Sequence, residues 1–159
     1  MLGTEFGGMP EFFANLYSVT HDPDHLAMAK RFTHHAVMDP LAAGQDRLRG
    51  LHVNTQVPKA LGAARLYELT GDEPSRSASA NFWEMVTQHR TYATGGASNY
   101  EYFRTDPDVL STALSSNDHE NCVTHNLLRL TRSIFERRPD AAVMDYYEKA
   151  LLNGIMGTH

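Results

Sequence analysis

The chain has 159 residues, of which 42% are hydrophobic, so it is long enough for one domain with a real core and too short to require two. Its formal net charge of -5 argues against nucleic acid or an anionic membrane surface as the main partner, because either would need a cationic face. No run approaches the ~20 apolar residues of a membrane span, and no secretory signal is evident. We therefore expect no nucleic-acid partner, no membrane partner and a cytoplasmic location, with which the single cysteine is compatible.

Six segments carry helical periodicity, and they come in pairs. In the first pair, Phe13 and Tyr17 mark one apolar stripe, and Ala29 and Phe32 mark the next one beyond the turn THDPD. Asp39-Pro40 is expected to forbid continuation, because the residue before a proline disfavours the helical conformation.

The second and third pairs follow the same plan. The second pair flanks TGDEPS, which supplies a glycine stop and a proline start. The third pair runs from Val123 to Leu151 around RRPD, and LYSVTHDPDHL and LYELTGDEPSR share their leucine-tyrosine, threonine and acidic turn. The pattern predicts an all-α fold of stacked αα-hairpins over a single domain, residues 1–159, either an open solenoid or a closed α/α toroid.

Two features of this stack bear on function. The segments between hairpins, roughly residues 41–56 and 92–119, carry Gly, Asn, His and aromatic residues, so we expect them to build any site. No polar capping repeat is evident at YYEKALLNGIMGTH. We therefore expect an exposed apolar end, through which the chain could form a homo-oligomer.

The only cysteine, Cys122, follows Glu120 by two residues at the start of a predicted helix. One interpretation is a buried thiol beside a solvated carboxylate. The other is a Glu-x-Cys metal chelate, which requires both residues to be pre-helical or in a distorted first turn, with Asp118 or Asn117 as the cap. The positive end of the helix would then favour the thiolate. Zinc needs three or four ligands, so these two are insufficient.

Two further stretches contain candidate site residues. In YATGGASNYEYFR, Glu101 is either a carboxylate in an aromatic pocket, with the raised pKa of a general acid, or an exposed glutamate between aromatic residues. The pair Gly95-Gly96 marks either a close backbone approach or a plain loop. In GLHVNTQVP, four hydrogen-bonding side chains lie just before a predicted helix: His52, Asn54, Thr55 and Gln56. They either bind a ligand, or the stretch serves as a helix cap through Asn54 or Thr55.

Five blocks of the sequence, in order, resemble the catalytic domain of glycoside hydrolase family 127, the β-L-arabinofuranosidases and their relatives. They are EFGGMPEFFANLY, RLRGLHVNTQVPKALGAARLYELTGD, TGGASNYEYFR, ENCVTHNLLRLTRSIF and DYYEKALLNGI, and they cover nearly the whole chain. The resemblance implies an α/α toroid that binds zinc and cleaves terminal β-L-arabinofuranose with retention, using a cysteine nucleophile. Retention needs a nucleophile and an acid/base on opposite sides of the bond.

By the same resemblance, Glu101 corresponds to the acid/base, Glu120 and Cys122 to the first two zinc ligands, and His52 to a sugar-binding histidine. The family's nucleophile comes from a downstream Cys-Cys pair, which this sequence does not contain. Tyr100 stands where relatives usually have glycine, and His125 where they often have tyrosine.

We therefore expect a fragment of a partial (α/α) toroid that acts on a carbohydrate only within a complete protein and is inactive alone. The alternatives are a non-catalytic helical-hairpin scaffold that binds a protein partner, and a self-contained metalloprotein in which His119 or His125 completes the metal shell.

Overall fold

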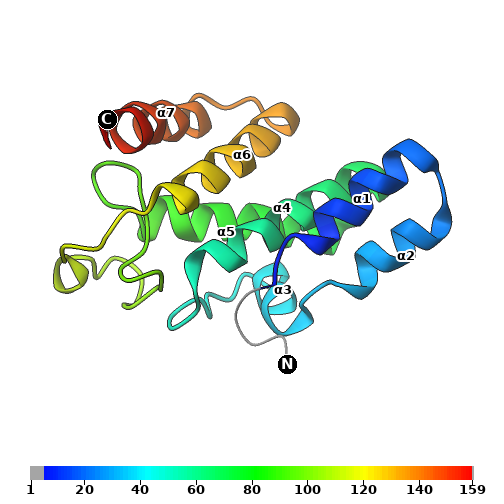
Figure 1. The fold of residues 1–159 in the computed structure, drawn as a ribbon, viewed down its shortest axis with the longest axis horizontal. Coiled ribbons are helices and arrows are strands. Elements are labelled where there is room, and N and C mark those ends of the chain that lie inside the picture. Colours follow the sequence, from blue (N-terminus) through cyan, green and yellow to red (C-terminus); the bar gives the residue numbers. More distant parts are fainter. Residues whose placement is uncertain (1–5, 159) are drawn as a thin grey trace. The chain divides into compact units, whose positions relative to one another are not determined.

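The computed structural model describes residues 6–158. Within these residues the chain folds into seven α-helices, three short 3-10 or π segments and no strand, which confirms the expected all-α class (Figure 1). No helix of this part is both long and apolar enough to cross a membrane. The chain divides into two compact units. The first comprises the residues up to Arg47 with Thr55–Phe82, and the second comprises Leu48–Asn54 with the residues from Trp83 onward.

The first unit begins with the expected hairpin of α1 (Met9–Thr20) and α2 (Pro23–Arg31), which lie side by side in Figure 1. His21 ends α1 in the left-handed conformation, with φ of 56°. The carboxylate of Asp22 then accepts a hydrogen bond from the backbone N–H of Asp24, the second residue of α2, and Pro23 occupies the first helical position, where its missing N–H costs nothing.

A third helix, α3 (His35–Ala42), was not expected, because Asp39-Pro40 predicted the end of helical structure. Pro40 lies inside this helix, and its missing N–H deprives the carbonyl of Ala36 of an i→i+4 partner. Ala36 is exposed, so water can bond to that carbonyl, which explains why a helix of only eight residues tolerates the proline.

The second hairpin joins α4 (Val53–Thr70) to α5 (Glu73–His89). Gly71 has a φ of +71° and makes the predicted glycine stop, and the carboxylate of Asp72 accepts a hydrogen bond of 3.0 Å from the backbone N–H of Ser75. Both helices contribute residues to both units. The N-terminal side of α4 belongs to the second unit, and the rest of that helix to the first.

The core of the first unit comes only in part from the predicted apolar stripes. Ala14, Ala29 and Leu66 are buried together, and of these only Ala29 was predicted; the partly buried hydrophobic residues packed against them are Phe13, Leu26 and Leu69. The ring of Phe13 also stacks on Phe32, with centroids 5.7 Å apart. Aromatic pairs at such distances contribute about 0.5–1.5 kcal/mol beyond their burial.

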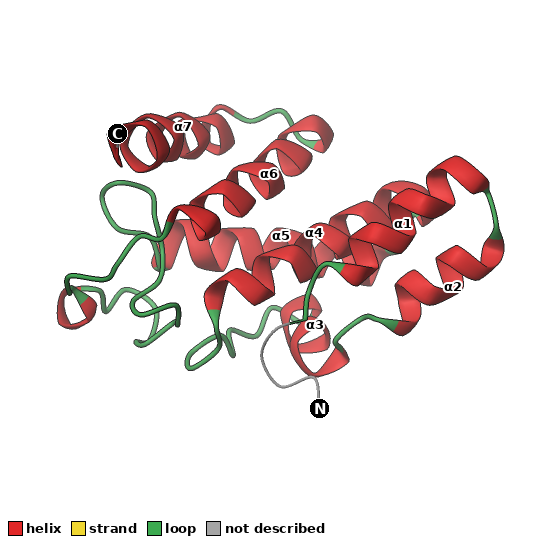
Figure 2. Cartoon of the chain, in the orientation of Figure 1, coloured by secondary structure: helices red, strands yellow, loops and turns green. Residues whose placement is uncertain are grey.

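The second unit contains the third expected hairpin, α6 (Asn121–Arg137) and α7 (Ala141–Lys149). After α7 the chain continues as a π-helical turn, Ala150–Ile155, in which each turn holds more residues than an α-helix. The segment that joins α5 to α6 is a long irregular loop, interrupted only by the 3-10 turn Ser111–Ala113 (Figure 2).

Buried polar contacts tie these parts of the second unit together. The indole Nε1 of Trp83 on α5 donates a hydrogen bond of 2.8 Å to the hydroxyl of Thr131 on α6. The Trp83 ring meets the ring of Tyr146 on α7 edge to face. The Tyr146 hydroxyl donates to the carbonyl oxygen of Gly95 at 2.9 Å, so α7 anchors the long loop directly.

Candidate active site

The loop around Glu101 is fixed by backbone hydrogen bonds to the segment that precedes α4. The N–H of Val53 donates to the carbonyl oxygen of Glu101 at 2.8 Å, and the N–H of Phe103 donates to the carbonyl oxygen of Leu51 at 3.0 Å. An isolated antiparallel bridge pairs His52 with Tyr102 between them. These bonds bring two residues singled out from the sequence, His52 and Glu101, to one place.

The same loop is also tied to the segment that precedes α6. The N–H of Tyr100 donates to the carbonyl oxygen of Asn117 at 3.0 Å, and the side-chain amide of Asn99 donates to the carboxylate of Asp118 at 2.7 Å. Ser98 donates a long hydrogen bond of 3.4 Å to the carboxylate of Glu120. The loop thus connects Glu101 with the proposed metal ligands.

Backbone strain is concentrated in this loop. Ser98, Tyr100 and Glu101 have φ values of 94°, 44° and 69°, and His119 has a φ of 60°. Each such non-glycine residue costs about 1–3 kcal/mol, and residues of this kind cluster at functional sites because the surrounding structure must hold them. Glycine is the residue that this backbone region favours. A glycine at the position of Tyr100, which the family resemblance led us to expect, would adopt this conformation without strain.

The side chains of His52 and Glu101 approach each other from the two paired segments. The Nε2 of His52 lies 3.6 Å from the Oε2 of Glu101, and the two side chains are 11% and 57% exposed. The imidazole contacts the ring of Tyr102 edge to face. Of the two expectations for Glu101, the exposed glutamate between aromatic residues is the one that the structure shows.

Glu120 and Cys122 lie at the start of α6. Glu120 is the N-cap residue, with φ of -59° and ψ of 131°, so it precedes the helix, whereas Cys122 is the second residue of α6. The predicted cap was wrong, because Asp118 instead accepts hydrogen bonds from Asn99 and from the backbone of Ser115.

The surroundings of Cys122 raise the pKa of its thiol, whereas the position at a helix start was expected to favour the thiolate. The residue is exposed, yet partial burial of its sulfur and then the nearby carboxylate of Glu120 raise the pKa of the thiol, and the carboxylate of Glu101 adds to this. The backbone N–H groups at the helix start lower the pKa of the thiol, but by less than the other groups raise it. In this chain alone the thiol is therefore the favoured form at neutral pH.

The Gly95-Gly96 pair is a place of close backbone approach, the first of its two sequence interpretations. A Cβ at Gly95, whose φ is +86°, would lie 2.8 Å from the Cα of Ala150, and a Cβ at Gly96 would lie 2.8 Å from the Cβ of His119. His119 is thereby held against Gly96, where burial lowers its pKa and its Nδ1 contacts the hydroxyl of Thr94 at 3.2 Å.

The donor set for a metal can be tested against these positions. Glu120 and Cys122 offer a carboxylate oxygen and a sulfur, two donor types that zinc accepts, and both lie at the start of α6. Residues 6–158 hold no group of three or more His, Cys, Asp or Glu side chains placed to bind a metal ion. The two residues fit part of a zinc shell.

A polar pair near these residues was missed in the sequence. Asn54, which lies within α4 rather than before it, accepts a hydrogen bond of 2.9 Å from the side-chain amide of Asn126 on α6. Arg129 donates to the other side of Asn126 at 3.3 Å. The signal was the spacing of four between Cys122 and Asn126, which places both on one face of a helix.

Comparison with known families decides the membership of the chain. The family model described as the β-L-arabinofuranosidase, GH127 catalytic domain, matches residues 1–159. The chain belongs to the GH127 family. No curated protein sequence matches it.

Solved structures share the fold of this GH127 chain. A GH127 β-arabinofuranosidase aligns with a TM-score of 0.72 at 20% identity, over 92% of this chain and 24% of its own length. A structure titled as a glycoside hydrolase aligns with a TM-score of 0.71 at 18% identity, over 92% of this chain and 28% of its own. A GH127 β-L-arabinofuranosidase from Geobacillus stearothermophilus T6 aligns with a TM-score of 0.70 at 22% identity, over 94% of this chain and 28% of its own. The chain thus spans about a quarter of the length of the solved structures that it matches.

Proposed function

We propose that this chain forms part of an (α/α) toroid catalytic domain, a retaining glycosidase for terminal β-L-arabinofuranosides or related sugars. The observation that carries the proposal is the strained loop that brings Glu101 beside His52 and links it to Glu120. Membership of a glycosidase family supports a carbohydrate as the substrate.

In this proposal Glu101 is the catalytic acid/base. Its exposed carboxylate can donate a proton to the leaving glycosidic oxygen and later take one from the attacking water, as retention requires. His52, held by its contact with Tyr102, would bind a sugar hydroxyl beside the reacting bond. Each role needs only a hydrogen bond from an exposed or partly exposed polar group.

We propose that Glu120 and Cys122 contribute a carboxylate and a sulfur to a zinc shell that other ligands complete. Zinc bound there would supply the positive charge that keeps a thiol deprotonated near neutral pH. The chain itself contributes the orientation of the two donors, since Glu120 precedes α6 and Cys122 lies in its first turn. Cys122 is then a ligand and not the nucleophile.

The polypeptide of 159 residues contains one cysteine and no Cys-Cys pair. We therefore propose that it binds the sugar without completing the catalytic cycle. The test uses the purified chain with two reagents: methyl β-L-arabinofuranoside for binding by NMR, and nitrophenyl β-L-arabinofuranoside for turnover. We expect weak saturable binding that shifts the amides of residues 50–54 and 98–104, and no appreciable turnover.

The two outcomes of this test are independent. Absence of binding at these amides would refute the sugar site. Appreciable release of nitrophenol would refute the proposal that the chain lacks a nucleophile. The α anomer of the same methyl glycoside is the control for binding, and it should bind less tightly.

Exposed apolar side chains support a second candidate, a helical scaffold that binds a protein partner or a second copy of the chain. Phe12 and Val19 on α1 are 56% and 79% exposed, and Leu152 and Met156 near the C-terminal end are 48% and 59% exposed. A measurement of mass in solution tests this candidate. A concentration-dependent dimer that Leu152→Glu disrupts would favour it, and a monomer at all concentrations would exclude self-association.

A further inference from the structure

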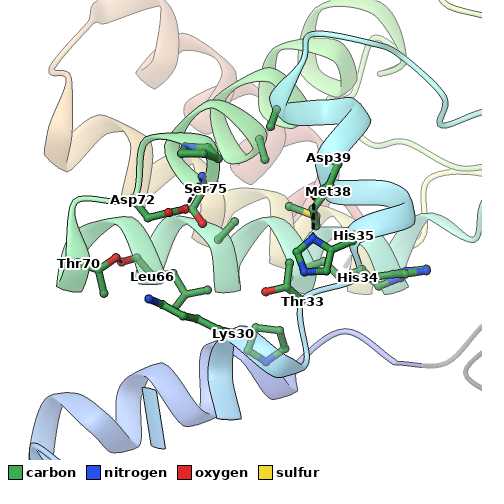
Figure 3. Close-up of a pocket in the computed structure, with 16 residues that line it drawn as sticks. Lys30, Thr33, His34, His35, Met38, Asp39, Leu66, Thr70, Asp72 and Ser75 are labelled. Atoms are coloured by element: carbon green, nitrogen blue, oxygen red, sulfur yellow. Dashed lines mark hydrogen bonds and ion pairs between the residues drawn. The ribbon is translucent and has the colours of Figure 1, made fainter. Parts of the chain in front are cut away.

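The first unit contains a cavity that none of the candidate active-site residues lines. Its volume is about 340 Å³, at the lower end of the range of about 300–1,000 Å³ that is typical of ligand pockets. Its lining residues come from α1, α2, α3, α4 and the first half of α5, and Figure 3 draws them as sticks. The cavity is therefore formed entirely within one compact unit of the fold.

The floor of the cavity is apolar. It is formed by the side chains of Met38, Ala63, Leu66 and Ala78, all of which are buried. An apolar group that entered the cavity would gain about 25 cal/mol for each Å² of surface removed from water. This wall therefore favours a ligand with a hydrocarbon body.

Most charged groups of the cavity wall already have partners in the first unit. The Nδ1 of His35 lies 2.9 Å from the carboxylate of Asp39, and Asp72 accepts the hydrogen bond from the backbone N–H of Ser75. Lys59 contacts Nδ1 of His34 at 2.9 Å and donates to the side-chain oxygen of Gln56 at the same distance. These groups are already engaged in contacts within the unit.

Lys30 differs from them. Its side chain is exposed at the cavity, and within residues 6–158 no carboxylate pairs with its ammonium group. The hydroxyls of Thr33 and Ser75 also make no side-chain hydrogen bond among the described residues, and Figure 3 shows both hydroxyls directed toward the cavity. The cavity wall thus presents one ammonium group that no carboxylate pairs with, together with two hydroxyl groups, whereas the carboxylate of Asp72 on the same wall is capped by a backbone N–H.

We propose that this cavity binds a small amphipathic carboxylate, whose hydrocarbon body packs on Met38 and Leu66 while its carboxylate accepts charge-assisted hydrogen bonds from Lys30 and Thr33. A charge-assisted hydrogen bond is roughly twice as strong as a neutral one, which makes the carboxylate the preferred head group. Because Lys30 is exposed, water screens the ion pair, and its contribution is modest. The apolar body supplies the rest of the affinity.

The test compares two probes that share one hydrocarbon body, 4-phenylbutyrate and 4-phenylbutan-1-ol. Binding to the intact 159-residue chain is followed by NMR through the amides of residues 33–39 and 70–78. We expect saturable binding of the carboxylate, at least about threefold tighter than that of the alcohol, since exposed ion pairs contribute up to about 1 kcal/mol.

Variants locate the site. Lys30→Gln should remove the preference for the carboxylate, whereas Arg31→Gln, an exposed cation on the same helix that does not line the cavity, should leave it unchanged. Ala78→Leu should fill the floor and weaken both probes, with circular dichroism as the check of folding. Because Lys30 is exposed, its replacement should leave the chain folded. The Lys30→Gln variant therefore tests the proposal even if the Ala78→Leu variant unfolds.

Three results would overturn the proposal. They are an absence of saturable shifts at these amides, equal affinity of the two probes for the original chain, and an unchanged carboxylate preference in the Lys30→Gln variant. A doubling of the mass in solution that protects the same amides would also overturn it, because a second copy would then cover the cavity.

Discussion

The Nε2 of His52 lies 3.6 Å from the Oε2 of Glu101, although the two residues come from different loops of the second unit. The pairing depends on backbone hydrogen bonds between residues 50–53 and 101–103, so the side chains are placed by main-chain geometry. A sugar hydroxyl that reached both groups could donate to the carboxylate and bond to the imidazole. This relationship underlies the first prediction.

Replacement of His52 by alanine should weaken the binding of methyl β-L-arabinofuranoside by about tenfold, because roughly one side-chain hydrogen bond is lost. The matched control is His89→Ala, since His89 also pairs with an exposed carboxylate, that of Asp108, at 3.0 Å. NMR titration of the purified chain measures both affinities. Equal losses in the two variants would contradict a direct role of His52.

Cobalt(II), used as a spectroscopic substitute for zinc, should bind the purified chain only weakly, because Glu120 and Cys122 form part of a shell, and at high cobalt concentration it should give a sulfur-to-metal charge-transfer band. We expect Cys122→Ser to abolish the band and Glu120→Gln to weaken cobalt binding roughly tenfold, whereas Glu148→Gln on α7 should have no effect. His119→Ala distinguishes the self-contained metalloprotein, in which this change would also weaken binding. A band that survives in Cys122→Ser would refute the proposed ligand.

Gly95→Ala should destabilise the chain by about 2–4 kcal/mol, because the new methyl group meets Ala150 and the backbone has a positive φ. Gly50 provides a matched control, since its φ is +83° but nothing lies within 4 Å of the added Cβ. Gly50→Ala should therefore cost only about 1 kcal/mol. Urea unfolding monitored by circular dichroism measures both, and equal costs would show that the contact with Ala150 is unimportant.

Tyr100→Gly should relieve backbone strain, since Tyr100 has a φ of 44° and a side chain that is about half exposed, at 49%. The expected gain in the free energy of unfolding is up to about 1 kcal/mol, because a left-handed conformation costs a non-glycine residue about 1–2 kcal/mol and glycine has a higher entropy in the unfolded chain. Urea unfolding measures it. A clear loss of stability would mean that the exposed ring makes contacts worth more than the strain.

Lys59 should make stability depend on pH. Burial lowers its pKa from 10.5 to about 8, so between these values the unfolded chain binds more protons than the folded one. The free energy of unfolding should then rise with pH through this window, by about 1–2 kcal/mol between roughly pH 7.5 and 9.5.

The Lys59→Met variant should lack this rise, and the exposed Lys30→Met variant should keep it. Differences between variants are the required quantity, because burial raises the pKa values of Tyr146 and Cys122, whose titration lowers stability at higher pH. Parallel pH profiles of the original chain and Lys59→Met would contradict the prediction.

The three hairpins were predictable because apolar spacing and turn chemistry are local properties of the sequence. Phe13 and Phe32 lie in the core contact that their stripes implied, and Gly71 ends α4 as expected. α3 was missed because a proline at position 40 is unfavourable in a helix, yet the carbonyl that it leaves unpaired belongs to an exposed residue, Ala36. Exposure of one carbonyl is not visible in the sequence.

The candidate site was predictable in its residues but not in its arrangement. Spacing placed Glu120 and Cys122 at the start of a helix, and this was confirmed. The raised pKa of the Cys122 thiol was not predicted. The carboxylates that raise the pKa of Cys122 include Glu101, which lies in another segment of the loop. Such contacts depend on the tertiary path of the loop, which local patterns do not encode.

The wide turn Ala150–Ile155 gives this architecture an unusual sensitivity to chain length. An α-helical turn there would need fewer residues to advance the same distance, so the loss of one residue would rotate Gly154, which packs beside the carbonyl oxygen of Thr94, away from the loop. Insertions and deletions near the C-terminal helix could thereby change the conformation of the loop that carries Glu101, even with an unchanged sequence around that glutamate.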